Sequence, residues 1–190
     1  MLRLMDEMKE LVDSMASAID AVAAQMDLEP GVGDNAKFQL GMFLMYLSAS
    51  DGEISWDEAD VISRLCDLDV TPTKLADFIR NSNIYSTEFE QTVPLALEVM
   101  LLADNMGMTE DSLSKLVIDT FKTVGEALIK SDNEVDENEM EDFNIYINMM
   151  EKYREEKYVG CKSATTGFIK NKGESVSAPT KGGVAAPRKG

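Results

Sequence analysis

Apolar residues recur every three or four positions along most of this chain, and this spacing constrains its fold more than any other feature. Because an α-helix completes one turn in about 3.6 residues, such spacing gathers apolar side chains on one helical face. No stretch alternates apolar and polar residues over the length of a strand. The sequence therefore predicts an all-α fold, a compact bundle of about seven helices.

The first expected helix covers residues 2–26 and is amphipathic. Its apolar face holds Leu4, Met5, Met8, Leu11, Val12, Met15, Ala18, Ile19, Val22 and Met26. The second expected helix covers 35–49, and it has too many apolar residues for an exposed helix, which places it at the centre of the bundle. These residues are Phe38, Leu40, Met42, Phe43, Met45, Tyr46 and Leu47.

Local signals mark where further helices begin. Ser55-Trp-Asp-Glu58 is a capping-box pattern that opens a helix over 55–68. Thr71-Pro72 opens a short helix, because proline suits the first helical position. Pro94 marks either a first turn or a kink in the next helix. The last three helices are expected over 88–105, 108–130 and 137–157.

The chain has 35 acidic and 18 basic residues, and they are unevenly distributed. Residues 161–190 hold six of the basic residues and one acidic residue, a net charge of +5, which leaves −22 for residues 1–160. An acidic body repels phosphates, so we expect it to make no direct contact with nucleic acid. The composition of 161–190, rich in Gly, Ser, Thr, Pro and Ala, predicts a disordered basic tail. This tail meets solvent, its own acidic body or another anionic surface.

Three parts are therefore expected along the chain. Residues 1–30 form an N-terminal amphipathic helix packed on or beside the bundle, 31–160 form the helical domain, and 161–190 form the basic flexible tail. No stretch resembles the apolar core of a signal peptide or is long enough to span a membrane. The two cysteines are far apart, as in reduced proteins, so we expect a soluble, cytoplasmic protein.

The absence of histidine excludes whole classes of chemistry. Ser-His-Asp catalysis and histidine-ligated zinc, haem or iron all require that residue. The sequence also holds no nucleophile motif, phosphate-binding glycine loop or cofactor fingerprint. We therefore expect a protein that is not an enzyme.

A twelve-residue pattern occurs twice, 81 residues apart. The first copy is Leu47-Ser-Ala-Ser-Asp-Gly-Glu-Ile-Ser-Trp-Asp-Glu58, and the second is Leu128-Ile-Lys-Ser-Asp-Asn-Glu-Val-Asp-Glu-Asn-Glu139. Five positions are identical, and each copy joins the end of one expected helix to the start of the next. The repeat predicts a bundle of two pseudo-symmetric helix-loop-helix halves.

The acidic residues of the repeat allow two interpretations. Glu58 and Glu139 each stand three residues after an N-cap residue, so helix capping alone accounts for them. Four other acidic residues have no such explanation: Asp51, Glu53, Asp132 and Glu134. Together the six offer hard oxygens of the kind that Ca²⁺ and Mg²⁺ bind. The pattern is not an EF-hand, because Ile62 and Phe143 stand where its final glutamate belongs.

The doubled pattern resembles the TerB-like helical domain of tellurite-resistance and related stress-response systems. The resemblance covers residues 35–157 and is carried by Ser50-Asp-Gly-Glu-Ile54 with Glu58, and by Ser131-Asp-Asn-Glu-Val135 with Glu139. Asn133 departs from the glycine of that family. The resemblance implies a divalent cation, calcium first and magnesium second. The implied ligands are Asp51, Glu53 and Glu58 in one loop and Asp132, Glu134 and Glu139 in the other.

Two functions are expected on these grounds. The resemblance implies a non-catalytic, metal-responsive interaction module of a stress-response system, with protein partners that include membrane-associated components. The second interpretation needs no metal: a purely structural helical adaptor that docks a protein partner through its acidic surface and N-terminal helix.

Overall fold

The computed structural model describes residues 2–50, 54–82, 87–131 and 137–159. Within these ranges it contains seven packed helices, a one-turn helix α5 and no strands, which confirms the all-α prediction. The elements are α1 (Leu2–Gln25), α2 (Val32–Leu47), α3 (Trp56–Cys66), α4 (Pro72–Asn81), α5 (Thr87–Glu90), α6 (Leu95–Met106), α7 (Leu113–Ile129) and α8 (Glu137–Lys157). The predicted tail over 161–190 lies outside the described residues.

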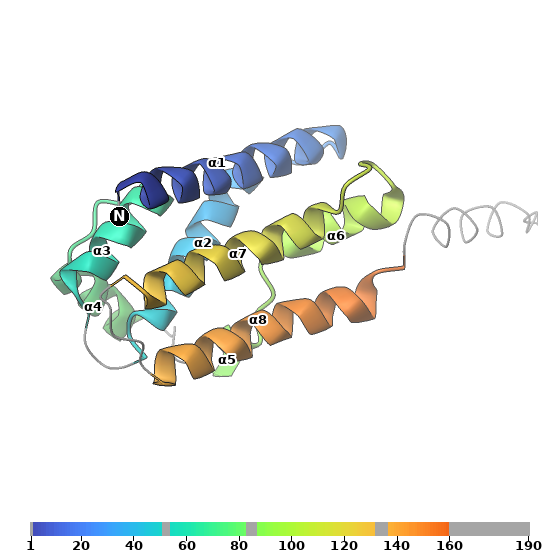
Figure 1. The fold of residues 1–190 in the computed structure, drawn as a ribbon. Coiled ribbons are helices and arrows are strands. Elements are labelled where there is room, and N and C mark those ends of the chain that lie inside the picture. Colours follow the sequence, from blue (N-terminus) through green and yellow to red (C-terminus); the bar gives the residue numbers. More distant parts are fainter. Residues whose placement is uncertain (1, 51–53, 83–86, 132–136, 160–190) are drawn as a thin grey trace, which may run out of the picture.

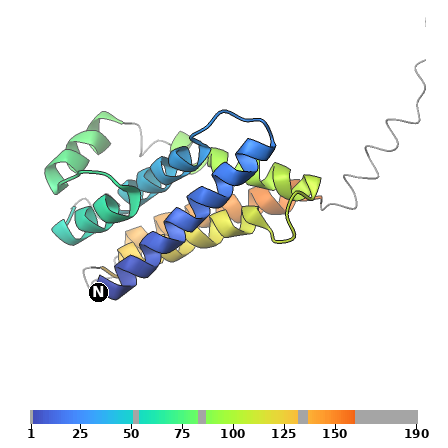
Figure 2. The same cartoon turned by 90° about the horizontal axis from the view of Figure 1, so that it is seen from above.

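The helices are arranged around α2 and α7. Figure 1 shows α1 and α8 on opposite sides of α7, and Figure 2 shows the same arrangement from the side of α1. Helix α2 packs against α1, α3, α6 and α7, while α3 and α4 lie at the end of the bundle that also holds the N-terminus of α1. The first helix is thus an integral part of the bundle.

The core confirms the two amphipathic patterns read from the sequence. On α1, Val12, Met15 and Ile19 are fully buried, as the spacing predicts. On α2, five of the seven expected apolar residues are buried and Met42 is partly buried, which confirms its central place. Phe38 is an exception, because 49% of it is exposed.

Aromatic rings fill the space between α2, α7 and α8. The ring of Phe43 lies 5.6 Å from that of Phe121 and is stacked on Tyr146 at 4.7 Å, centroid to centroid. Gly125 lies against this cluster, and a Cβ atom there would come within 2.9 Å of the Phe43 and Phe143 rings. The missing side chain of Gly125 therefore lets α7 approach the rings of α2 and α8.

A close approach between α1 and α2 sets where α2 begins. Gly31 precedes the helix with a φ of 97°, in the left-handed region that favours glycine. The backbone N–H of Gly33 donates to Asp20 Oδ1 at 2.7 Å. This contact fixes the first turn, so α2 starts at Val32, three residues before the expected start at 35.

Two other expected helix starts were wrong. Instead of one helix over 88–105 there are two, because Pro94 adopts an extended conformation (φ −57°, ψ 132°) and serves as the N-cap of α6. The helix expected from residue 108 begins at Leu113, where the Ser112 hydroxyl accepts a hydrogen bond from the Lys115 N–H at 3.3 Å. Among the described residues, no helix combines the length and apolar character needed to cross a bilayer.

Candidate functional site

The first acidic junction links α2 to α3 and forms the predicted capping box. Ser55 Oγ accepts from the Glu58 N–H at 3.1 Å, and Glu58 Oε2 accepts from the Ser55 N–H at 2.7 Å. Only 4% of Glu58 is exposed. One of its carboxylate oxygens is therefore occupied by capping. Asp51 and Glu53, the other two predicted ligands of this junction, lie outside the described residues.

The second acidic junction links α7 to α8. Its predicted ligands Asp132 and Glu134 lie outside the described residues, as does the predicted N-cap residue Asp136. Glu139, in the first turn of α8, is 95% buried, since only 5% of it is exposed. The two described members of the predicted ligand set, Glu58 and Glu139, are thus both buried in the fold.

One side-chain contact brings the two junctions together. Ser50, immediately before the first acidic loop, donates from Oγ to Asp142 Oδ2 at 2.5 Å. Asp142 lies in α8, five residues after that helix begins at the close of the second junction. Figure 1 shows the end of α2 and the start of α8 at the same end of the molecule. Segments 92 residues apart in the chain therefore meet at one acidic surface.

Two carboxylates at this surface were missed by the sequence reasoning. Glu90 Oε1 of α5 accepts from the Tyr46 hydroxyl at 3.2 Å, and Asp142 also interacts with this hydroxyl. Burial, followed by the charges of Asp142 and Glu90, raises the pKa of Tyr46 above its ordinary value, so the phenol keeps its proton. No local sequence motif indicates this group, because its members come from three separate helices, α2, α5 and α8.

The described part of this surface is not by itself a metal centre. Across residues 2–50, 54–82, 87–131 and 137–159, no three or more Asp, Glu, Cys or His side chains are grouped so that they could hold an ion. Glu90 and Asp142 supply hard oxygens of the right chemistry, while Glu58 is engaged in capping. The other four predicted ligands lie outside the described ranges, so the predicted cation site is not tested by the described residues.

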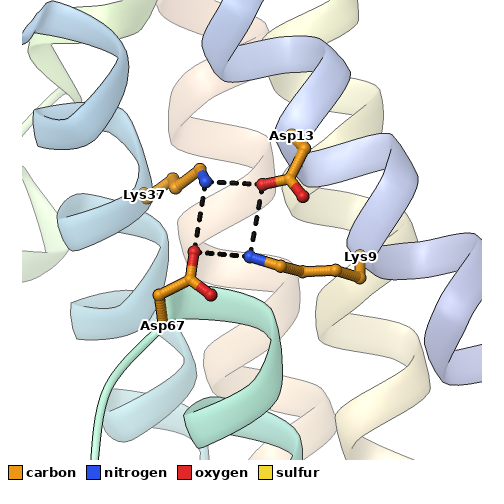
Figure 3. A network of polar contacts seen from close by, with 4 residues as sticks. All are labelled: Lys9, Asp13, Lys37 and Asp67. Atoms are coloured by element: carbon orange, nitrogen blue, oxygen red, sulfur yellow. Dashed lines mark hydrogen bonds and ion pairs between the residues drawn. The ribbon is translucent and has the colours of Figure 1, made fainter.

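A second polar cluster joins α1, α2 and the end of α3 (Figure 3). Two lysines and two aspartates alternate around a ring. Lys9 Nζ lies 3.2 Å from Asp13 Oδ1 and 2.5 Å from Asp67 Oδ2. Lys37 Nζ lies 2.5 Å from the same Asp13 oxygen and 3.2 Å from the same Asp67 oxygen. The ring is electrically neutral, which favours a structural clamp over a binding site for ions.

The ring shifts the pKa values of Asp13, Asp67 and Lys37 in the direction that favours their ionised forms. Partial burial raises the pKa of Asp13, but hydrogen bonds from Lys37 and Lys9 outweigh it and hold that pKa below its ordinary value. The hydrogen bond from Lys9 chiefly lowers the pKa of Asp67. The hydrogen bond to Asp13 raises the pKa of Lys37, against the opposing effect of desolvation. Asp67 is the C-cap residue of α3, and its φ of 56° is a left-handed backbone conformation that ends the helix.

A third polar cluster is buried between α6, α7 and α8. Asp104, only 5% exposed, accepts from the Leu113 N–H at 2.8 Å, the Ser114 N–H at 3.0 Å and the Ser112 hydroxyl at 2.8 Å. The Ser114 hydroxyl also donates to it. Arg154 of α8 donates from Nε to Ser114 Oγ at 2.9 Å and from Nη2 to Ser112 Oγ at 3.2 Å. A carboxylate from one helix thereby caps the start of the next, where the helix dipole favours negative charge.

Comparisons with known proteins found no relative of this chain. The chain matches no protein-family model, no curated protein and no solved structure. The resemblance to TerB-like domains therefore stays a prediction that rests on the repeated residues themselves.

Proposed function

We propose that this protein is a non-catalytic interaction module that binds a divalent cation at its two acidic junctions. The observation that supports this most is the Ser50–Asp142 hydrogen bond, which places the first junction beside the helix that follows the second. Two loops of matching sequence would then contribute to a single acidic surface. Binding there would change the surface offered to protein partners of a stress-response assembly.

The proposed ligands are the four acidic residues of the repeat that helix capping does not account for: Asp51, Glu53, Asp132 and Glu134. Glu58 and Glu139 close the ends of the junctions, with Glu58 contributing one oxygen to its capping box. A hard cation such as Ca²⁺, or Mg²⁺ in second place, suits an all-oxygen set in a chain without histidine. We further propose that each junction is the loop of one helix-loop-helix half, and that the two halves form a TerB-like domain.

Thermal unfolding of the full chain tests the cation. Protein freed of metal with EDTA is melted alone, with Ca²⁺ and with Mg²⁺. We expect Ca²⁺ to raise the melting temperature, since a ligand present at 100 times its Kd stabilises the folded state by about 2.7 kcal/mol. Asp51→Asn and Asp132→Asn should each reduce this shift, while the exposed Asp111→Asn is the matched control.

The same series distinguishes one shared site from two. If both loops hold one ion, either substitution abolishes the whole shift in melting temperature. If each loop holds its own ion, each substitution removes only part of it. Equal melting temperatures with EDTA, Ca²⁺ and Mg²⁺ would remove cation binding from the proposed function.

A structural adaptor that docks a basic partner is the second candidate function. It is supported by the outer face of α1, which presents exposed carboxylates while the apolar face is buried in the core. The exposed carboxylates are Asp6, Glu7, Glu10 and Asp20. The N-terminal helix would therefore dock through charge, because its apolar side chains are already used in the bundle.

Poly-lysine provides a probe for this acidic face. We expect it to bind the protein in low salt and in EDTA, and to bind less to the charge-reversed variant Asp6→Lys/Glu10→Lys. Glu110→Lys/Asp111→Lys, on the loop between α6 and α7, is the control because it reverses the same number of exposed charges. Equal weakening of poly-lysine binding in both variants would show that net charge alone drives the binding, and it would contradict a docking face on α1.

A further inference from the structure

A groove lies between α3 and α7 and is also lined by the first turns of α1. Figure 1 shows these parts of the three helices at the same end of the bundle. Its volume is about 490 Å³, within the range of roughly 300–1,000 Å³ that is usual for binding pockets. Met5 and Met8 of α1 contribute to its lining between the two helices. The wall from α3 consists of Asp57, Asp60, Val61 and Arg64. This spacing of three, four and seven residues is that of a single helical face.

The opposite wall repeats this spacing on α7, with Glu126, Ala127 and Lys130 among its members. Apolar side chains from all three helices line the groove, and the charged residues of α3 and α7 provide its polar part. Methionine suits such a surface, because its unbranched side chain adapts to the shape of an apolar partner.

The charges of the groove favour a cationic partner. Asp60 pairs with Arg64 at 2.9 Å, and Glu126 pairs with Lys130 at 3.3 Å, each within its own helix. Asp57 makes no ion pair within the part of the chain that the structure describes. The five charged groups sum to −1, and residues 1–160 as a whole carry −22. A positively charged segment with an apolar element would therefore be complementary.

The chain itself contains such a segment. Phe168-Ile169 is followed by Lys170-Asn171-Lys172, and Phe168 is the only aromatic residue after position 160. A large apolar pair flanked by two lysines matches a groove that combines methionines with carboxylates. Being part of the same chain, the segment is also present at a high effective concentration.

The length of chain between the last described residue and this segment limits how far the segment can reach. Val159 is anchored by its N–H to Asn105 Oδ1 at 2.9 Å. Eight residues, 160–167, lie between Val159 and Phe168, and the nine Cα–Cα steps from one to the other span at most about 30 Å. Near the end of α8, Arg154 contacts Ser114, which lies about 14 Å along α7 from Thr123 at the near edge of the groove.

We propose that this groove binds residues 168–172 of its own chain. The Phe168-Ile169 pair covers the methionines of α1, and the two lysines face the carboxylates at the start of α3. The contact gives the basic tail a defined partner and covers an apolar surface of the body. It goes beyond the proposed function and is independent of cation binding at the junctions.

A nitroxide in the tail tests this on the full chain. Cys161→Ser/Asn171→Cys places one reactive thiol beside the lysines, while Cys66 resists labelling because it is buried. We expect the methyl NMR signals of Met8 and Ala127 to lose most of their intensity. Leu102, exposed on α6, is the internal control. Stronger broadening at Leu102 than in the groove, or uniform broadening over the surface, overturns the proposal.

Substitutions in the tail show whether the segment itself is recognised. Phe168→Ser/Ile169→Ser should restore the intensities of the Met8 and Ala127 signals, whereas Val176→Ser, the matched control elsewhere in the tail, should leave them low. Asp57→Asn should restore them in part. EDTA should change none of these results, so they are separate from the test for a cation. Unchanged broadening in the double-serine variant would overturn the proposal.

Discussion

The carboxylate of Asp104, two residues before the end of α6, accepts a hydrogen bond from the Leu113 N–H at the start of α7 at 2.8 Å. Asp104 is buried, and the hydroxyls of Ser112 and Ser114 donate to it as well. The loop between the two helices is thus held across its ends by a single side chain. This relationship leads to the first prediction.

Replacing Asp104 with alanine should lower the free energy of unfolding by about 3 kcal/mol, because several buried donors lose their acceptor at once. Asp104→Asn keeps the shape and one acceptor oxygen, so its cost should be smaller. Urea denaturation at pH 7 measures both, with the exposed Asp111→Asn as control. A loss below that of Asp111→Asn would contradict a capping role for Asp104.

Glycine substitutions in α2 should have opposite effects. At Gly33 a Cβ atom would lie 2.6 Å from Asp20 Oδ2 and closer still to the Ala16 carbonyl oxygen, so Gly33→Ala should cost about 1–3 kcal/mol. At Gly41 the nearest atoms are 3.4 Å away, an ordinary contact. Gly41→Ala should therefore be neutral or stabilise the helix by up to about 1 kcal/mol. Thermal melts of both variants make the comparison, and equal destabilisation would refute the close approach at Gly33.

The charge ring around Lys37 predicts how stability depends on pH. The pKa values of Asp13 and Asp67 are lowered on folding, so their contribution is present above the ordinary value of 3.8 and is lost as the pH falls through the folded-state values. The raised pKa of Lys37 adds stability below 10.5 that is lost at higher pH. Because 45% of Asp13 and 61% of Asp67 side chains are exposed, solvent screening keeps the contribution small.

Lys37→Met should therefore lower stability by about 1 kcal/mol or less at pH 7. The difference from the natural chain should shrink when the aspartates are protonated, and also in high salt. Urea denaturation at neutral and acidic pH measures it. Lys74→Met removes another surface ion pair, between Lys74 and Asp69, and is the control for an isolated pair. A difference that persists in acid would show that packing of the Lys37 side chain matters more than its charge.

Cys66 should be chemically inert in the folded protein. Burial raises the pKa of this thiol to about 12, so almost no thiolate exists at neutral pH. In the Cys161→Ser variant, Ellman's reagent should react with Cys66 only slowly until denaturant is added. Cys161 in the Cys66→Ala variant is the comparison thiol. Fast reaction of Cys66 in the native protein would mean that α3 opens readily.

Sequence reasoning succeeded where the physical cause is local. The spacing of Val12, Met15 and Ile19 was enough to identify the buried face of α1, because helical periodicity depends only on neighbouring residues. The capping box of Ser55 and Glu58 was likewise predicted and found, since both partners lie within one turn.

It failed where partners come from separate helices. Nothing near Asp104 in the chain indicates that it caps the next helix, and nothing near Tyr46 indicates two carboxylates around its hydroxyl. The start of α7 was placed five residues too early, because Ser112 and Thr109 are both suitable N-cap residues and the local sequence does not decide between them. Four of the six predicted ligands lie outside the described residues, so the cation site stays a prediction.

The Ser50–Asp142 contact also has a consequence for how the molecule folds. It closes a loop of 92 residues, and loop entropy makes so long a closure slow and unfavourable until other contacts have formed. The α2–α3 pair or the α7–α8 pair, expressed alone, would contain one acidic loop but lack the partner across this contact. The Ser50–Asp142 contact therefore belongs to the complete fold and has no counterpart in either fragment.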